Sequence, residues 1–279
     1  MKSLYATTVE QIQERTDASV IEVETDVDLY YAMALSMYNM IEINNRIGKH
    51  TVFILPVGPV FQYRRFITLL NSRPLDLSDL HLFFMDEYLV DGEDRWISEE
   101  SPLSFRGFIE KELILPMPEK FGLNKQQIHF PDPADPSAYD SLIEDLGGVD
   151  LCHAGVGIVG HVAFNEPIPK EDISSDDFVA LPTRIVSLTP QTITINANTA
   201  LRGAYDEIPR RAVTVGMKQI LKAGSIRLFF NRPWQSAVFR KALLLDPTSE
   251  FPVTFLRDHP DVAYVVTPIV GSMPEFELK

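Results

Sequence analysis

The chain has 279 residues and a formal net charge of −14, because 39 acidic side chains outnumber 25 basic ones. This surplus argues against a nucleic-acid or anionic-membrane surface, whose phosphates would be repelled, but it is compatible with one small basic pocket. The single cysteine, Cys152, excludes an intrachain disulfide and a cysteine metal cluster. No apolar stretch has the length of a membrane span and the N-terminus lacks a signal-peptide pattern, so we expect a cytoplasmic protein of one domain, residues 1–279.

Short apolar runs alternate with amphipathic ones in the first half of the chain. Strands are expected at residues 19–23, 51–55, 80–85 and 127–130. Thr25 or Asp26 can cap a helix that stops at Gly48, and a second helix follows around residues 66–70. Further helices are expected at 101–115, started by Ser101 and Pro102, and at 136–146.

The second half continues the same alternation. A strand begins at Val149 and contains Cys152, which we interpret as a buried structural thiol. Residues 167–177, rich in Pro, Ser and acids, are expected to form a mobile loop or lid. Later elements are expected as helices at 209–221 and 233–244 and strands at 226–230 and 262–266. The alternation of apolar strands with helices predicts an α/β, Rossmann-like, open and mostly parallel sheet with helices on both faces.

The most informative segment is residues 150–167, where an apolar run opens into a loop with Gly155, Gly157 and Gly160. His161 follows at once and Glu166 lies five positions further on. Ligands of open α/β sheets bind beyond the carboxyl ends of the strands, and glycines let the backbone approach them closely. Imidazole titrates near neutral pH and a carboxylate partner fixes its tautomer, which suits acid–base chemistry. The alternative is a surface loop with an incidental histidine.

Two other strand ends carry features of interest. Asp86 and Glu87 follow the third apolar strand, and one of them is expected to face the same sheet edge as His161, where burial would suit it to act as a base. The alternative is that Asp86 caps a turn or the next helix. The stretch 56–60 after the second strand, with Gly58, has the form of a truncated ligand loop, a weak signal because Pro-Gly turns are common.

These residues resemble the glucosamine-6-phosphate deaminase/isomerase family, which is related to the 6-phosphogluconolactonases. Residues 160–167, Gly-His-Val-Ala-Phe-Asn-Glu-Pro, are similar to the Gly-His-Ile-Ala-Phe-Asn-Glu-Pro signature of that family. Residues 84–88, Phe-Met-Asp-Glu-Tyr, resemble its Asn-Met-Asp-Glu-Tyr, and weaker similarities extend through most of the chain. The Asn-Glu-Pro ending favours the deaminase branch over the lactonase branch.

The resemblance implies a hydrolase or isomerase that needs no cofactor and couples aldose–ketose isomerisation to loss of ammonia from an amino sugar phosphate. It implies that Asp86 is the base that moves a proton from C2 to C1, that His161 opens the sugar ring, and that Glu166 holds His161. The expected partner is a small sugar or sugar phosphate, and assembly into a homo-oligomer is left open. The expected substrate-binding residues are Gly58, Gly157, Gly160, Asn165 and Arg184.

The chain also departs from the family pattern. Val159 stands where the family usually has Asp, so His161 lacks one carboxylate partner and ring opening is expected to be slower. The family's phosphate loop supplies hydroxyls and backbone N–H groups, whereas residues 56–60 here have no hydroxyl and carry Pro59, which has no N–H. The family's phosphate-binding Arg and Lys fall near Asn198 and Gln235.

An unphosphorylated or differently charged sugar is therefore the favoured ligand, and a phosphate site rebuilt by displaced arginines is the alternative. The candidates for such a rebuilt site are Arg64, Arg65, Arg202 and Arg232. Arg184 is the one residue of the family's allosteric site with a counterpart, and a structural role explains it equally well. The alternative function, from a different class, is a catalytically impaired sugar-binding or regulatory homologue.

Other chemistries lack a matching pattern. No Gly-x-Gly-x-x-Gly opens a helix with a downstream acid, and no nucleophile elbow is present. The remaining histidines have no zinc-like spacing, and none is expected to bind a metal: His50, His81, His129, His153 and His259. His153, inside an apolar run, is expected to be a core residue.

Overall fold

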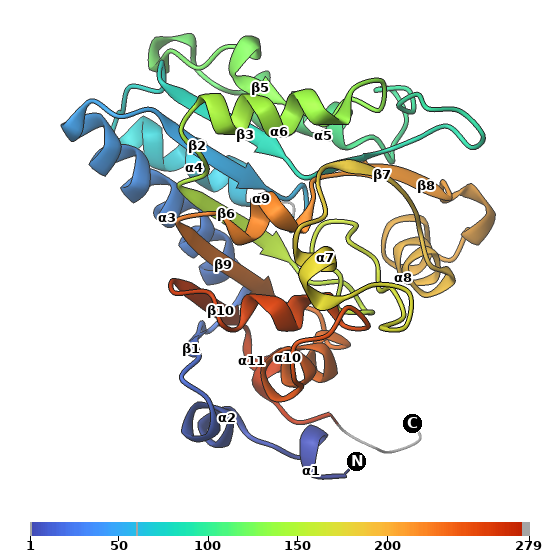
Figure 1. The fold of residues 1–279 in the computed structure, drawn as a ribbon. Helices are drawn as coiled ribbons and strands as arrows, with labels where there is room; N and C mark the ends of the chain where they lie inside the picture. Colours follow the sequence, from blue (N-terminus) through green and yellow to red (C-terminus); the bar gives the residue numbers. More distant parts are fainter. Residues whose placement is uncertain (1, 60, 275–279) are drawn as a thin grey trace.

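A parallel sheet organises the computed structural model, which describes residues 2–59 and 61–274; Val60 of the loop after the second strand lies outside the described residues (Figure 1). Within them, seven strands pair in the order β1-β10-β9-β6-β2-β3-β5, and every pairing is parallel. The predicted α/β class is confirmed. The strands are β1 (Ser19–Glu22), β2 (Thr51–Leu55), β3 (Leu80–Phe84), β5 (Ile128–His129), β6 (Leu151–Gly155), β9 (Ser225–Phe230) and β10 (Val262–Val266).

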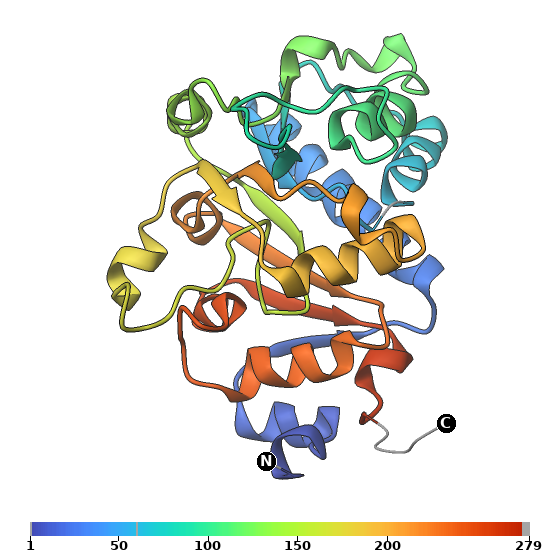
Figure 2. The same cartoon turned by 90° about the vertical axis from the view of Figure 1, so that its right-hand side faces the viewer.

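Helices cover both faces of this sheet because successive strand side chains point to opposite sides. In β2, Val52 and Ile54 pack with α2, α6, α9 and α10, whereas Phe53 and Leu55 pack with α3, α4 and α5. Figure 2 shows these two layers on either side of the strands. The helices are α1 (Lys2–Tyr5), α2 (Val9–Arg15), α3 (Asp26–Ile47), α4 (Gln62–Ser72), α5 (Phe105–Ile109), α6 (Pro136–Asp145), α7 (Ser175–Val179), α8 (Pro190–Leu201), α9 (Met217–Leu221), α10 (Gln235–Leu244) and α11 (Pro268–Gly271).

Several predicted boundaries are confirmed and have local causes. Thr25 accepts a hydrogen bond from the Asp28 amide at the start of α3, and Gly48 caps its end. Cys152 is fully buried in β6, which raises the pKa of its thiol. The expected loop at 167–177 ends in α7, whose Phe178 is fully buried. No helix of the described residues is long and apolar enough to cross a membrane.

A second, antiparallel sheet was not predicted. It consists of β4 (Asp86–Tyr88), β8 (Arg211–Thr214) and β7 (Arg184–Ser187), in the order β4-β8-β7. The predicted helix at 209–221 is therefore wrong in its first part, and only α9 remains of it. Pairing on both sides of β8 satisfies its backbone groups, and this tertiary contact outweighs local helix preference.

The predicted start of the helix at 101–115 is also wrong. Residues 101–104 form a turn, closed by a hydrogen bond from the Ser104 amide to the Ser101 carbonyl. The Ser104 side chain then caps α5, and the helix continues as a π-helical turn at Glu110–Ile114. Short 3₁₀ turns complete the chain: Glu119–Phe121, Lys125–Gln127, Tyr205–Glu207 and Pro252–Leu256.

The segment before α2 and the α11 segment are both hydrogen-bonded to one buried cation, Arg240. The Arg240 side chain, on α10, is fully buried. Its guanidinium donates to the carbonyls of Thr7 (2.9 Å), Ser236 (3.0 Å), Val270 (3.2 Å) and Gly271 (2.8 Å). Burial lowers the pKa of Arg240, and the carbonyls replace the water it loses. A single side chain thus fastens the segment before α2 and the α11 segment to α10.

A second buried titratable group, His153 of β6, affects stability. Its ring is fully buried, and Nε2 lies 2.8 Å from the Ser36 hydroxyl of α3. Nδ1 has no hydrogen-bond partner among the described residues. Burial and, second, the nearby Arg227 lower the pKa of His153 to about 3. The core position predicted for His153 is confirmed.

We expect His153 to make the fold sensitive to mild acid. The folded-state pKa lies below the ordinary value, so the unfolded chain binds a proton first and stability falls as pH drops from about 6.5 toward 3. Between pH 7 and 5 this one group costs about 2 kcal/mol. Urea unfolding at both pH values should show that His153→Met reduces the loss by about this amount.

The control for this experiment is His50→Gln, which changes an exposed histidine and should keep the wild-type pH dependence. An equal loss of stability in His153→Met and in the wild type would contradict the assignment.

Candidate functional site

The chain passes from the parallel to the antiparallel sheet at the carboxyl end of β3, where β4 follows. Met85 is the single residue between β3 and β4. Its amide donates to the Leu55 carbonyl at the end of β2 (3.1 Å), and its carbonyl accepts from the Val215 amide after β8 (2.7 Å). Because both sheets hold Met85, the next residue, Asp86, is fixed beside the carboxyl ends of the parallel strands.

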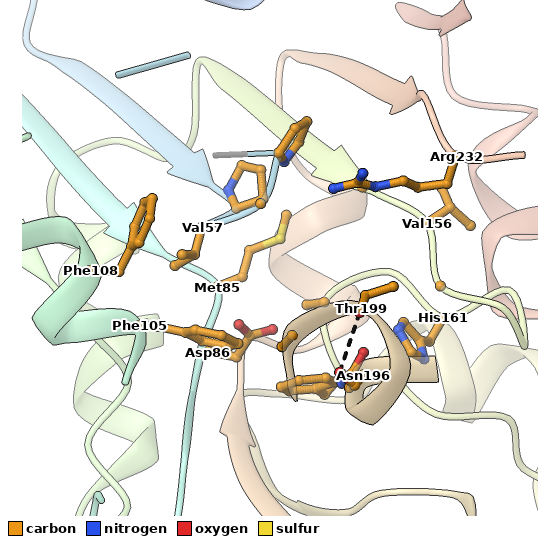
Figure 3. Close-up of a pocket in the computed structure, with 18 of the residues that line it drawn as sticks. Val57, Met85, Asp86, Phe105, Phe108, Val156, His161, Asn196, Thr199 and Arg232 are labelled. Carbon is orange, nitrogen blue, oxygen red and sulfur yellow. Dashed lines mark hydrogen bonds between the residues drawn. The ribbon is translucent and has the colours of Figure 1, made fainter. Parts of the chain in front are cut away.

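Asp86 is one wall of a cavity of about 530 Å³ that His161 also lines (Figure 3). Its side chain is buried, and none of the described residues donates a hydrogen bond to its carboxylate. Burial, and second the neighbouring charge of Glu87, raise the pKa of Asp86 well above the usual range. A carboxylate in this position is a stronger proton acceptor than a surface aspartate.

Glu87 points away from the cavity and organises its wall. Its fully buried carboxylate accepts hydrogen bonds from the backbone amides of Tyr88 (2.8 Å), Phe105 (3.1 Å) and Arg106 (2.9 Å) and from the Ser104 hydroxyl (2.8 Å). Burial raises the pKa of Glu87 and these donors oppose the rise. Glu87, rather than Asp86, thus accepts the first two amides of α5, whose N-cap residue is Ser104.

The loop after β6 folds back on itself and presents His161. The Gly157 amide donates to the His161 carbonyl (3.0 Å). A Cβ on Gly157 would lie 1.9 Å from His161 Nε2, so a glycine is required for the ring to occupy this place. Gly160 has a φ of +80°, and a Cβ there would lie 2.6 Å from the Phe251 ring. These two glycines explain the spacing in the sequence.

His161 is held from behind by polar groups. Its Nδ1 lies 3.2 Å from Glu166 Oε1 and 3.2 Å from the Thr192 hydroxyl of α8. The other Glu166 oxygen accepts a hydrogen bond from the Thr189 hydroxyl (2.8 Å). Glu166 itself is buried behind the ring and does not line the cavity. Thr192 is the hydrogen-bonding neighbour of Nδ1, whereas Glu166 Oε1 has no hydrogen-bond partner among the described residues and acts as a nearby charge. Nε2 is the nitrogen directed toward Gly157.

The expected substrate-binding residues divide into two groups. Gly58 and Gly157 line the cavity. Gly160, Asn165 and Arg184 lie behind the loop: Asn165 is fully buried and donates to the carbonyls of Val162 and Val215, each at 2.9 Å, and Arg184 donates to the Asn165 side chain at 2.8 Å. These three residues support the loop that carries His161.

Sequence reasoning missed much of the remaining wall. Helix α8 lies across the strand ends in Figure 2 and contributes Asn196 and Thr199; Asn196 donates to the Tyr88 hydroxyl (2.9 Å). Phe105, Phe108 and Trp234 add aromatic side chains to the wall. A neutral polar residue on a helix gives no sequence signal of its own, and the aromatic residues read as core positions.

The four arginines proposed for a rebuilt phosphate site differ in whether they line the cavity. Of the four arginines considered, Arg232 lines the cavity, whereas Arg64 pairs with Glu112 on the surface. Arg65 and Arg202 are exposed and outside the cavity wall. Asn198 does not line the cavity, but Gln235 does.

Metal ligation finds no support in residues 2–59 and 61–274, where no group of three or more His, Cys, Asp or Glu side chains could hold an ion. His81 Nδ1 of β3 and His129 Nε2 of β5 lie 3.2 Å apart. Burial lowers the pKa of both rings, that of His129 to about 4.

Comparison with known proteins gives consistent relatives, although no family model matches the chain. It is 29% identical to a glucosamine-6-phosphate deaminase of Thermoanaerobacter pseudethanolicus over 239 residues, 82% of this chain and 87% of the relative. It is also 29% identical to a glucosamine-6-phosphate deaminase of Lachnoclostridium phytofermentans over 244 residues, 85% of this chain and 95% of the relative.

Solved structures show the same fold. A monomeric glucosamine-6-phosphate deaminase aligns with a TM-score of 0.78 and 24% identity, over 92% of this chain and all of that one. A 6-phosphogluconolactonase from Trypanosoma cruzi aligns with a TM-score of 0.66 and 17% identity, over 91% and 95% of the two chains. These relatives confirm the predicted resemblance: in sequence the chain is similar to the glucosamine-6-phosphate deaminases, and its fold is the one they share with the 6-phosphogluconolactonases.

Proposed function

We propose that the protein is an aldose–ketose isomerase that releases ammonia from an amino sugar. The observation that carries this proposal is the cavity at the strand ends, which has the buried carboxylate of Asp86 on one side and His161, backed by Glu166, on the other. Similarity to glucosamine-6-phosphate deaminases supports the same reaction class.

The proposed chemistry needs a base and a ring-opening group, and no bound cofactor takes part. His161 moves a proton between the ring oxygen and the C1 hydroxyl, which opens the pyranose. Asp86 then takes the proton from C2 and returns it to C1. The C1 oxygen gains the proton that the C2 amine loses, so that C1 becomes a hydroxymethyl group and an imine forms at C2. Water adds to this imine and ammonia leaves, which gives the ketose. Gly157, which lines the cavity, lets the loop backbone come close to the sugar.

A weakened relative is the second candidate. Val159 replaces the acid usual in the family, and Glu166 is the one carboxylate paired with His161 among the described residues. A sugar-binding or regulatory protein would retain the cavity without turnover. Ammonia and ketose release from phosphorylated and unphosphorylated amino sugars, measured with purified protein, separates the two candidates.

Asp86→Asn should abolish exchange of the C2 proton with solvent, because an amide cannot accept it. Deuterium incorporation from D₂O, followed by NMR, measures this step directly. The control is Asp79→Asn, which changes an exposed carboxylate at the opposite ends of the strands and should exchange at the wild-type rate. Unchanged exchange in Asp86→Asn would exclude the proposed base.

His161→Gln should slow turnover of closed-ring sugars by about a hundredfold or more while sparing open-chain analogues, because only the closed ring needs an acid–base group at its oxygen. Steady-state rates with a matched pair of substrates, one unable to cyclise, report this difference. An equal loss on both substrates would assign His161 another role.

Glu87→Gln should move the acidic limb of the pH–rate profile to lower pH, because the Glu87 charge is the second cause that raises the pKa of Asp86. Glu99→Gln is the matched control: it also contacts Arg106 (2.8 Å) but is exposed and remote from Asp86. An acidic limb that stays in place in a folded Glu87→Gln variant would show that burial alone sets the proton affinity of Asp86.

A further inference from the structure

One cavity residue, Arg232, is a cation without a protein partner. It follows β9 by two positions and is the only Lys or Arg among the described residues that line the cavity. Figure 3 shows its guanidinium extending over the cavity toward the side of Val57. No carboxylate of the described chain pairs with it, although the protein carries a net charge of −14. Arg64 and Arg106, by contrast, have Glu112 and Glu99.

The backbone amides around Arg232 are already engaged. The amides of Asn231 and Arg232 both donate to Gln235 Oε1, each at 2.9 Å. The Gln235 side chain is buried and held in place by its own bond to the Val156 carbonyl (2.8 Å). Pro233, in the same turn, and Pro59, across the cavity, have no N–H. The amides of Asn231 and Arg232 are therefore not available to a ligand, and the guanidinium of Arg232 is the one positive charge that the described cavity lining offers it.

This donor set distinguishes between classes of anion. A phosphate dianion in a protein is usually bound by several N–H groups together with a cation. A carboxylate has one charge and two oxygens in a plane, which match the fork of a single guanidinium. Apolar side chains, Val57, Phe229 and Trp234, line this end of the cavity beside the neutral amides of Asn231 and Gln235. None of these neighbours is a second cation, so a second negative charge would be costly there.

We propose that Arg232 determines substrate specificity by binding a carboxylate at the end of the sugar remote from C1 and C2, so that the substrate class is an amino sugar acid. This inference rests on the proposed function for the position of C1 and C2 beside Asp86 and His161. Arg232 selects the remote end of the substrate and takes no part in the proton transfers.

Binding of three open-chain amino hexitols that differ only at C6 tests the proposal without turnover. C6 is a hydroxymethyl group in the first compound, the carboxylate carbon in the second and a phosphorylated hydroxymethyl group in the third. Their affinities are measured by calorimetry at one ionic strength. The carboxylate should bind about tenfold or more tighter than the hydroxyl compound, and no more weakly than the phosphate. In Arg232→Gln the preference for the carboxylate should disappear, whereas Arg65→Gln, an exposed arginine outside the cavity, should retain it.

A second variant tests the role of the engaged amides. Gln235→Ala frees the amides of Asn231 and Arg232, so the affinity for the phosphate compound should rise relative to that for the carboxylate. Thermal unfolding shows whether the variant remains folded, and Arg232→Gln carries the test if it does not.

The two proposals fail in different ways. Tightest binding of the phosphate compound by the wild type, or a carboxylate preference that survives Arg232→Gln, overturns the role of Arg232 and leaves the isomerase intact. Arg232-dependent carboxylate binding with no ammonia release from any amino sugar acid overturns the proposed function and leaves the anion site.

Discussion

The whole site depends on the way Met85 is bonded to two sheets at once. Its amide completes the parallel sheet at the end of β2, and its carbonyl begins the antiparallel sheet beside β8. A change of sheet within one residue leaves almost no freedom in the position of the following side chain. Asp86 is therefore placed by backbone hydrogen bonds, the most rigid constraint available at a strand end, and its buried carboxylate needs no side-chain partner to hold it.

The second half of the site is built by close contact. His161 occupies space that a side chain at Gly157 would fill, and Thr192 of α8 and Glu166 hold its ring from behind. Asp86 and His161 line the same cavity. Glu87, next to Asp86, fixes the first turn of α5, which forms another part of the cavity wall. Proton affinity and cavity shape are thus set by neighbouring residues of the same strand.

Sequence patterns predicted the parallel sheet well because its inner strands, such as β2 and β6, are apolar and buried on both faces. The run at Thr51–Leu55, between Gly48 and Pro56, leaves little choice other than a buried strand. Strand β8 was missed because its four residues pair with segments far away in the chain, and distant pairing has no local signature. For the same reason the strand pattern alone nominated Asp86 and Glu87 as a pair, and only the resemblance to a known family favoured Asp86 as the base.

The arginines show the same limit. Arg64, Arg65, Arg202 and Arg232 are equivalent in composition, and only the fold distinguishes the one in the cavity from the one paired with Glu112. The use of the turn amides by Gln235 is likewise invisible in the sequence, since a glutamine can be exposed, buried or bonded to the backbone without any change in pattern.

The parallel pairing of β1 with β10 joins Ser19 to Ala263, and Arg240 joins Thr7 to Gly271. During synthesis on the ribosome, β1 and the first two helices are made long before β10, α10 and α11 and must therefore wait for them before they find their partners. Until then β1 has an open edge and α2 an uncovered apolar side, where chaperones could bind and other chains could add. The segment of α1, α2 and β1 thus finds its partners late, so a nascent chain stalled before β10 would expose the unpaired edge of β1 and the apolar side of α2.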